Sequence, residues 1–386
     1  MSDKLTRPTI GFNKPHIGGK EIDYIMEAVR REKISGNGYF TRCCQDFLEK
    51  RYGIRKVLLT TSCTDALEMA ALLIRTEPGD EIIMPSYTFV STANAFALRG
   101  ANIIFADSAA NSPNIDLEKL EPLITDRTIA IVVVHYAGFS CDMDRLMAIA
   151  SLHDLYVIED AAQAIESTYK GRPLGSIGHL GCFSFHETKN VISGEGGALL
   201  INDSAFLDRA EIIWEKGTNR SAFARGEIDK YNWIDLGSSF LPSEITAAFL
   251  LAQLEKIEEI QARRHAIWDI YHKTLRPLER KGVVSLPLIP SFNEHNAHIF
   301  YLVCRSEKER NKLLDYLNSN GINAIFHFIA LHRSPYYLVR YKGYELHQCD
   351  RYTSTLVRLP IYFELSVKDA HYIARTITNF YDEGMG

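Results

Sequence analysis

Short apolar runs alternate with amphipathic segments along the first two hundred residues. The apolar runs predict strands at 56–60, 81–85, 102–107, 130–136, 156–160, 182–185 and 197–201, and helical patterns lie at 64–74 and 91–100. Near-continuous apolar strands that alternate with helices predict an α/β domain with a mostly parallel central sheet covered on both faces. Ligands of such sheets bind at the carboxyl ends of the strands.

The second half of the chain has a different pattern. Residues 242–275 form one long helical pattern, for which Ser243 is the predicted N-cap. Beyond it, the elements that suggest a smaller α+β domain are apolar segments at 283–290, 298–303 and 322–328 and helical patterns at 307–321 and 367–381. We therefore predict a large α/β domain with an N-terminal segment, residues 1–255, and a small C-terminal domain, residues 256–386.

Composition narrows the class of protein. The 386 residues carry a formal net charge of -5, which argues against general nucleic-acid binding because that needs a basic face. Seven cysteines at spacings that fit no zinc pattern indicate reduced thiols and no metal site. The polar N-terminus lacks a signal peptide's apolar region, and no apolar run reaches membrane-spanning length, so we expect a cytoplasmic protein.

Two of the predicted strands end in polar groups suited to a ligand. In TSCTDAL, residues 61–67, a helix begins after a strand, so its N–H groups and the hydroxyls of Ser62 and Thr64 suit a phosphate. The alternative is that these hydroxyls only cap the helix. In VIEDAAQA, Asp160 could hold a proton on a ring nitrogen and Gln163 could donate to a nearby oxygen. The alternative there is a solvated strand end or a helix cap.

Two further stretches supply an aromatic ring and an amine. Phe89, in PSYTFVSTANAF, could stack on a flat heterocycle, although such a residue is often simply core. Lys189 lies between an aromatic-rich segment and a glycine turn, where lost solvation makes its neutral, Schiff-base-forming amine easier to reach. The alternative is a surface lysine. Together the four stretches provide every part that pyridoxal phosphate needs.

These stretches also carry a resemblance to a known family. PSYTFVSTANAF, VVHYAG, EDAAQ, GCFSFHETKN, GEGGA and FHFIALH resemble the sugar aminotransferases of the DegT/DnrJ/EryC1/StrS family, over nearly the whole chain. The resemblance implies pyridoxal 5′-phosphate as cofactor and the aspartate aminotransferase fold, also called fold type I. It also implies a homodimer in which each subunit contributes to its neighbour's active site.

The resemblance implies specific roles. Lys189 is the imine-forming lysine and then the acid/base, and Asp160 keeps the pyridine nitrogen protonated. The further implied cofactor contacts are Gln163 to the ring hydroxyl, Phe89 to the ring face, Cys63 and Thr64 to the phosphate, and Ser184 through its hydroxyl.

The sequence departs from the family at two positions. Members often have glycine where Cys63 stands, which puts the tightness of that loop in question. Many place an asparagine of the partner subunit near the phosphate where this chain has Leu241, and Ser238 or Ser239 is the candidate substitute. Some relatives replace the imine lysine with histidine and dehydrate, so the presence of Lys189 supports transamination.

The stretches 210–233 and 236–244 resemble members that make dTDP-4-amino-4,6-dideoxygalactose. The implied reaction moves an amino group from L-glutamate to C4 of a dTDP-4-keto-6-deoxy-hexose. The candidate substrate contacts are Asn219, Arg220, His186, His327 and His332, each of which has a purely structural alternative, a solvent-facing turn for the first two and a structural histidine for the others.

Other functions stay open at this point. The same chemistry could give the gluco epimer or a 3-amino sugar, because only the pocket would change. Of a different class are a pyridoxal-phosphate-binding regulator without turnover and a cofactor-free binding module. The set of Lys189, Asp160, Gln163 and Thr64 disfavours these last two.

Overall fold

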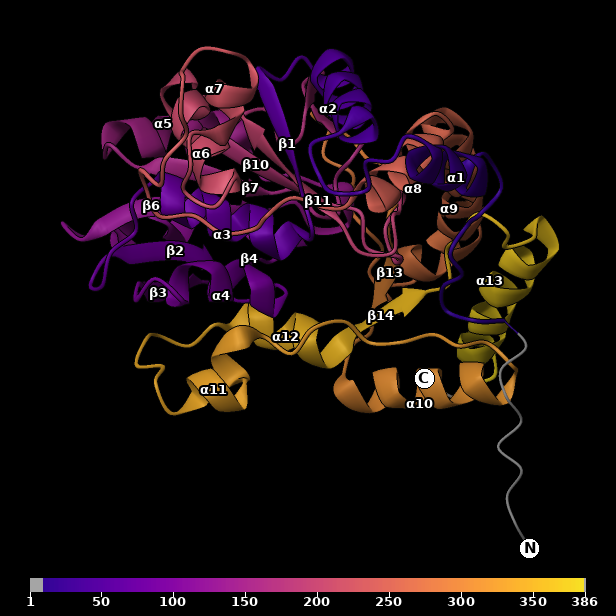
Figure 1. Cartoon of the computed structure of the whole chain (residues 1–386). Coiled ribbons are helices and arrows are strands. Elements are labelled where there is room, and N and C mark those ends of the chain that lie inside the picture. Colours follow the sequence, from indigo (N-terminus) through magenta and orange to yellow (C-terminus); the bar gives the residue numbers. More distant parts are fainter. Residues whose placement is uncertain (1–9, 385–386) are drawn as a thin grey trace, which may run out of the picture.

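A seven-stranded sheet forms the centre of the protein (Figure 1). The coordinates are a computed structural model that describes residues 10–384. The strand order is β1-β11-β10-β7-β6-β2-β3, and β11 alone runs in the direction opposite to the other six strands. This mostly parallel sheet confirms the predicted α/β fold. The strands are β1 (Lys56–Thr60), β2 (Glu81–Pro85), β3 (Asn102–Ala106), β6 (Thr128–Val134), β7 (Tyr156–Asp160), β10 (Leu180–Ser184) and β11 (Gly197–Ile201).

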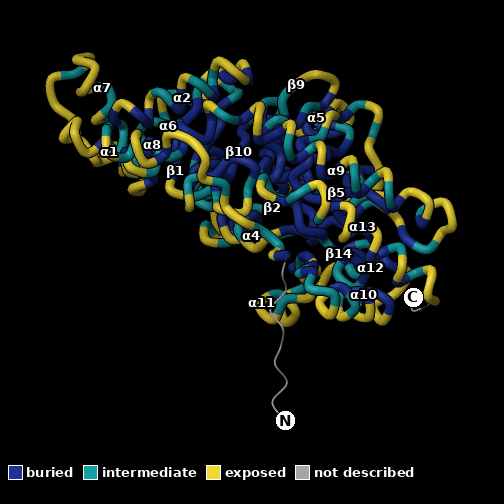
Figure 2. Tube along the Cα trace, turned by 90° about the vertical axis from the view of Figure 1, so that its right-hand side faces the viewer, coloured by how far each residue is buried: buried dark blue, intermediate teal, exposed yellow. Residues whose placement is uncertain are grey.

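Both faces of this sheet are buried under helices. Alternate residues of β2 enter different cores, with Ile82 and Met84 in one and Ile83 in the other. Helices α3, α4 and α6 contribute to the first core, and α2, α5 and α8 to the second. The helices are α2 (Tyr39–Tyr52), α3 (Cys63–Leu73), α4 (Val90–Ala97), α5 (Met143–Leu152), α6 (Leu207–Trp214) and α8 (Glu244–Leu254). Figure 2 shows the buried residues gathered along the sheet and the exposed ones around the periphery, where the segment at α7 (Arg220–Ala224) projects from one end.

The helical pattern at 242–275 forms two helices, so the prediction of one long helix was wrong. Helix α8 ends at Leu254, and α9 runs from Ile257 to Arg280. The two helices have different surroundings, because α8 packs on α1 (Glu21–Arg30) and α2 while α9 packs on α13 (Val367–Asp382). Ser243 does cap α8, through a hydrogen bond from the N–H of Thr246. The proposed domain boundary after residue 255 coincides with this break and stays a prediction.

The C-terminal part packs against the carboxyl ends of the sheet strands (Figure 1). Its two-stranded sheet pairs β13 (Phe300–Val303) with β14 (Leu356–Leu359). The segments at 283–290 and 322–328 form no strand and contribute only isolated bridges, which pair Ser285 with Val303, Ile322 with Ile10 and Ile325 with Arg358. The remaining helices are α10 (Glu307–Ser319), α11 (Pro335–Leu338) and α12 (His347–Thr355), and the short strands are β4 (Ser108–Ala109), β5 (Ser112–Ile115), β8 (Thr168–Tyr169), β9 (Arg172–Pro173) and β12 (Asn293–Glu294).

Three further observations concern cysteines, metals and membranes. All seven cysteines are free thiols. Within residues 10–384, no three or more histidine, cysteine or acidic side chains gather as metal ligands would. Over the same range, no helix combines the length and the apolar character needed to cross a bilayer.

Candidate active site

A cavity of about 650 Å³ opens where β6, β7 and β10 end, between the large sheet and the C-terminal part. It brings together most of the side chains that the sequence singled out. The predicted site residues that line it are Cys63, Thr64, Phe89, Asp160, Gln163, Ser184, His186, Lys189 and His327. Segments far apart in the sequence therefore converge on Lys189, as expected for the ends of parallel strands.

Lys189 lies in the connection between β10 and β11, which covers residues 185–196. Backbone hydrogen bonds fasten this connection, from Ser193 N to Phe185 O at 2.7 Å and from Glu187 N to Gly194 O at 2.9 Å. Burial lowers the pKa of the Lys189 amine, and the nearby positive charge of Arg358 acts in the same direction, against the opposing influence of Cys63 and Asp160. The neutral, nucleophilic form of the amine is thus easier to reach than on an exposed lysine.

Asp160 ends β7 and is buried, with both carboxylate oxygens held in place. Thr92 Oγ1 donates to Oδ2 at 2.7 Å, and the N–H of Ala162 donates to Oδ1 at 3.2 Å. Gln163 is fixed as well, because its side-chain oxygen accepts the N–H of Ala137 at 2.7 Å. The amide nitrogen of Gln163 is therefore the end of that side chain left to donate to a ligand.

The N-terminus of α3 borders the cavity and meets the start of β11. Ser62 caps the helix by accepting the N–H of Asp65, so the cap alternative is correct for its hydroxyl. The first-turn N–H groups, those of Cys63 and Thr64, have no partner within the helix and suit a phosphate. A Cβ added at Gly197 would lie 2.4 Å from the Cys63 amide nitrogen. The cradle thus requires glycine there.

The two aromatic residues of the segment at 85–96 have different surroundings. Tyr87 is core, since its ring is buried and its hydroxyl donates to the carbonyl of His327 at 2.6 Å. Phe89 is 57% exposed although it lines the cavity, and its ring centroid lies 6.2 Å from that of Phe328. An exposed phenyl ring at the cavity wall has a free face for stacking on a flat ligand.

The two histidines that line the cavity differ in burial. His327 is buried with its Nδ1 2.7 Å from the Tyr136 hydroxyl, and burial holds its pKa well below the usual range, so it is a neutral ring. His186 lies at the more exposed part of the wall, where its Nδ1 is 2.9 Å from the Thr188 hydroxyl. Both positions allow contact with a ligand in the cavity.

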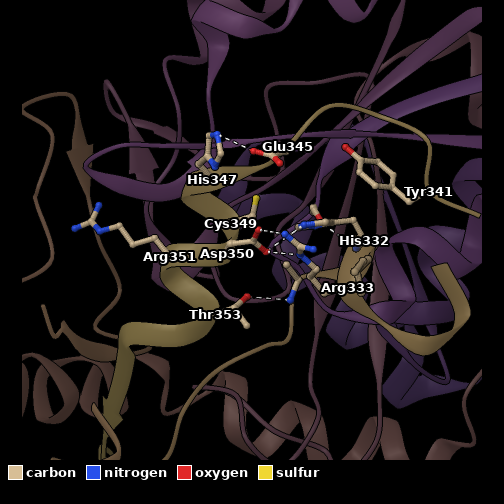
Figure 3. A network of polar contacts seen from close by, with 12 residues as sticks. His332, Arg333, Tyr341, Glu345, His347, Cys349, Asp350, Arg351 and Thr353 are labelled. Atoms are coloured by element: carbon tan, nitrogen blue, oxygen red, sulfur yellow. Dashed lines mark hydrogen bonds and ion pairs between the residues drawn. The ribbon is translucent and has the colours of Figure 1, made fainter. Parts of the chain in front are cut away.

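His332 lies outside the cavity lining, in a network that fastens the loop after His327 (Figure 3). Its Nδ1 is 2.8 Å from Ser86 Oγ, and its Nε2 is 3.2 Å from a carboxylate oxygen of Asp350. Arg333 donates to the same carboxylate at 3.0 Å. The structural alternative is therefore favoured for His332, because its contacts join this loop to the end of β2 and to α12.

Asn219 and Arg220 do not reach the Lys189 cavity within one chain. Asn219 accepts the N–H of Asn232 through its side-chain oxygen at 2.7 Å, as a turn residue would. Arg220 lines a second cavity, of about 320 Å³, together with Ser239 and Leu241. The position at which the family places a partner-subunit asparagine is therefore close to Arg220 and outside the lining of this chain's own lysine cavity.

Sequence reasoning missed several residues of the Lys189 cavity. Thr92 holds Asp160, while Arg264, His298 and Arg358 line the wall. Arg264 donates to the carbonyls of Ala297 and His298, at 3.2 and 2.7 Å. One signal was available for Arg358, because it is a lone charge within the apolar run LVRLP.

The chain also resembles known proteins over nearly its full length. The profile of the DegT/DnrJ/EryC1/StrS aminotransferase family matches residues 15–378. A spore coat polysaccharide biosynthesis protein of Bacillus subtilis is 33% identical over 367 residues, which cover 93% of each chain.

Two solved structures extend the likeness to the fold. An aminotransferase from Psychrobacter cryohalolentis superposes with a TM-score of 0.91 at 25% identity, over 97% of this chain and 100% of the other. A DegT/DnrJ/EryC1/StrS aminotransferase from Brucella abortus gives a TM-score of 0.84 at 27% identity, over 94% and 95%. The chain therefore belongs to the DegT/DnrJ/EryC1/StrS aminotransferase family, whose members have the type I aminotransferase fold and depend on pyridoxal phosphate.

Proposed function

We propose that the protein transfers an amino group from L-glutamate to C4 of a dTDP-linked 4-keto-6-deoxy-hexose, giving dTDP-4-amino-4,6-dideoxygalactose and 2-oxoglutarate. The observation that carries this proposal is the convergence of Lys189, Asp160 and the α3 N-terminus on one cavity in a member of an aminotransferase family. A sugar substrate is supported by the Bacillus relative named for polysaccharide biosynthesis. The C4 position and galacto product rest on the resemblance of residues 210–233 and 236–244.

Different residues of the cavity hold different parts of the cofactor. Cys63 and Thr64 hold its phosphate through their N–H groups, with Ser184 adding a hydroxyl and Phe89 the stacking face. Gln163 donates its amide to the ring hydroxyl. Two observations support this assignment: the side-chain oxygen of Gln163 is fixed by the N–H of Ala137, and Gly197 leaves the N-terminus of α3 uncovered.

Two ionisable residues carry the chemistry. Pyridoxal phosphate, when bound, supplies an aldehyde carbon that accepts an amino group and a ring that takes up an electron pair. Asp160 holds a proton on the ring nitrogen. The hydrogen bonds from Thr92 and Ala162 fix the orientation of the Asp160 carboxylate. Lys189 takes a proton from the amino acid's α-carbon and delivers a proton to the former aldehyde carbon of the cofactor. Its lowered pKa favours the neutral amine that accepts the first proton.

The substrate contacts are proposed for two groups of residues. His186 and His327 border the Lys189 cavity and are positioned to meet the sugar. Arg220 and Asn219 belong to a different surface, so we propose that they act in the partner's site of a homodimer with shared active sites. The supporting observation is that Arg220 and Leu241 line one cavity, since the family places a partner-subunit residue at the latter position.

The test is proton NMR of the product after incubation with dTDP-4-keto-6-deoxyglucose, L-glutamate and pyridoxal phosphate. A small H3–H4 coupling means an axial amine and the galacto product. A large coupling means the gluco epimer, which keeps the aminotransferase and overturns the product. If a verified holoenzyme gives no amino sugar, 3-keto sugars are tested next, and a spectrum that ignores glutamate identifies a regulator without turnover.

A further inference from the structure

His298 presents a buried imidazole to the Lys189 cavity from the segment just before β13. The residue lines the cavity and is only 7% exposed. Its Nδ1 lies 2.8 Å from Oδ1 of Asn190, the residue that follows the lysine. Among residues 10–384 the other ring nitrogen, Nε2, has no hydrogen-bond partner and is not sealed inside the protein. Nε2 is therefore the nitrogen of this ring that a ligand in the cavity can reach.

The contacts of Asn190 fix which ring nitrogen of His298 carries the proton. Asn190 Nδ2 donates to the backbone carbonyl of Asn296 and to Oε1 of Gln261, both at 2.8 Å. A backbone carbonyl can only accept, so the opposite orientation of the Asn190 amide would set two oxygens against each other. Asn190 Oδ1 therefore faces His298 and accepts from it, which places the proton of the neutral ring on Nδ1. Nε2 is left with a lone pair and acts as an acceptor.

The surroundings of His298 keep this imidazole neutral and fix its place. Burial lowers the pKa of His298 well below its usual range. The positive charges of Lys189, Arg264 and Arg358 shift that pKa in the same direction. The backbone is held as well, since His298 N donates to Asn296 Oδ1 at 3.1 Å and His298 O accepts from Arg264 at 2.7 Å. The ring thus offers the cavity one hydrogen-bond acceptor in a fixed direction.

An acceptor of this kind needs a ligand group that donates a hydrogen bond. The polar atoms of the cofactor are assigned to other residues, and the carboxylates of glutamate and 2-oxoglutarate only accept. The hexose, by contrast, carries hydroxyl groups. Of the two ring carbons next to C4, C5 bears the methyl group and C3 bears a hydroxyl. Because C4 reacts at Lys189 and Asn190 joins His298 to that lysine, the C3 hydroxyl is the donor that Nε2 is placed to meet.

We propose that His298 Nε2 accepts a hydrogen bond from the C3 hydroxyl of the hexose, and that Asn190 is the positioning residue that fixes the ring for this contact. The inference rests on the proposed function and deepens it by assigning a contact at the carbon next to the reacting one. The contact favours sugars with a hydroxyl at C3 over sugars that are deoxygenated there, because a C3 methylene leaves the buried acceptor unpaired.

Equilibrium binding separates this contact from the chemistry. The probes are dTDP-6-deoxygalactose and its 3-deoxy analogue, which carry no ketone and do not react with the holoenzyme, so calorimetry gives their Kd values directly. His298→Asn keeps a donor for Asn190 at the place of Nδ1 but removes Nε2. We expect it to raise the Kd for dTDP-6-deoxygalactose roughly 3- to 10-fold, the range for one neutral hydrogen bond. The Kd for the 3-deoxy analogue should stay within about twofold of wild type.

Two controls and a second readout complete the design. His298→Gln is the rescue variant, because its side-chain oxygen reaches the place of Nε2, and its discrimination between the probes should stay closer to wild type. His371→Asn makes the same change as His298→Asn at an exposed position of α13 and should alter neither Kd. Nitrogen NMR of the wild-type holoenzyme, with His298 assigned from either variant, should show the proton on Nδ1. The Nε2 signal should shift with dTDP-6-deoxygalactose and not with the 3-deoxy analogue.

The outcomes overturn different claims. An unchanged ratio of the two Kd values in His298→Asn refutes the contact, whether both values stay the same or both rise equally. A proton on Nε2 in the NMR spectrum overturns the tautomer and with it the acceptor. If the wild-type protein binds both probes equally well, the proposed substrate class stands while the contact fails. If it binds neither, the proposed substrate fails, and the contact fails with it.

Discussion

Replacement of Gly197 by alanine probes the phosphate cradle directly. The added Cβ would lie 2.4 Å from both the Cys63 nitrogen and the Ser62 carbonyl carbon, about 1 Å closer than ordinary contact. Gly197 has little room to retreat, because its strand is paired with Thr60 on one side and Ser184 on the other. The start of α3 has to move instead, which misaligns its N–H groups. Overpacking of this kind costs about 1–3 kcal/mol of folding stability.

The assay compares two ligands. Apo-enzyme is titrated with pyridoxal phosphate and with pyridoxal, which keeps the aldehyde for Lys189 but lacks the phosphate. We expect Gly197→Ala to weaken pyridoxal phosphate binding roughly 10- to 100-fold, since charge-assisted hydrogen bonds are lost. Pyridoxal binding should change little.

Gly11→Ala is the matched control, because its Cβ would meet nothing closer than 3.7 Å. The cradle assignment is refuted if Gly197→Ala binds pyridoxal phosphate like wild type. Equal losses for both ligands would refute it as well, because they would indicate a general distortion of the site.

Three further predictions concern charged residues that line the site or adjoin it in β7. Lys189→Ala should lower transamination at least roughly 100-fold while cofactor absorbance shows retained binding; a near-normal rate would end the acid/base assignment. Asp160→Asn should leave the fold intact, because asparagine still accepts from Thr92, yet reduce the rate by roughly 100-fold or more. Glu159 and His135 form a fully buried pair, so Glu159→Gln should lower the unfolding free energy by about 3 kcal/mol in urea titrations. Contacts with His135 lower the pKa of Glu159 below its usual value near 4.5 despite burial, so its contribution is present above that pH and is lost as pH falls through the folded-state pKa. The stability gap between the two proteins should narrow in that acid range.

The sequence predicted the parts of the site that follow from one strand or one turn. Asp160 and Gln163 could be placed because an apolar strand ends beside them, and parallel strands bring such ends together. Contacts between residues from distant segments of the chain could not be predicted. No local pattern links Thr92 to Asp160 or joins Arg358 to Phe12, since each of these contacts brings together residues that are far apart in the sequence.

The same limit explains the two incorrect or incomplete readings. Periodicity alone continued one helix through residues 255 and 256, but the contacts made there are tertiary, with Lys256 donating to the Gly18 carbonyl at 2.7 Å. Side-chain chemistry likewise suggested Arg220 as a substrate contact, although within one chain it lines a different cavity. Local sequence records the residue types that chemistry needs, while packing decides which of them share a cavity.

The position of Lys189 follows from the one antiparallel strand of the sheet. Because β11 runs back beside β10, the connection between them turns at the carboxyl end of β10, where Ser184 borders the cavity. The lysine is carried on that turn, and the glycines after it let β11 begin against the start of α3. This one reversal of chain direction therefore sets the distance between the amine and the phosphate cradle. A change in the length of this turn would move the lysine relative to the cradle without altering either residue, so the rate should fall more than cofactor affinity.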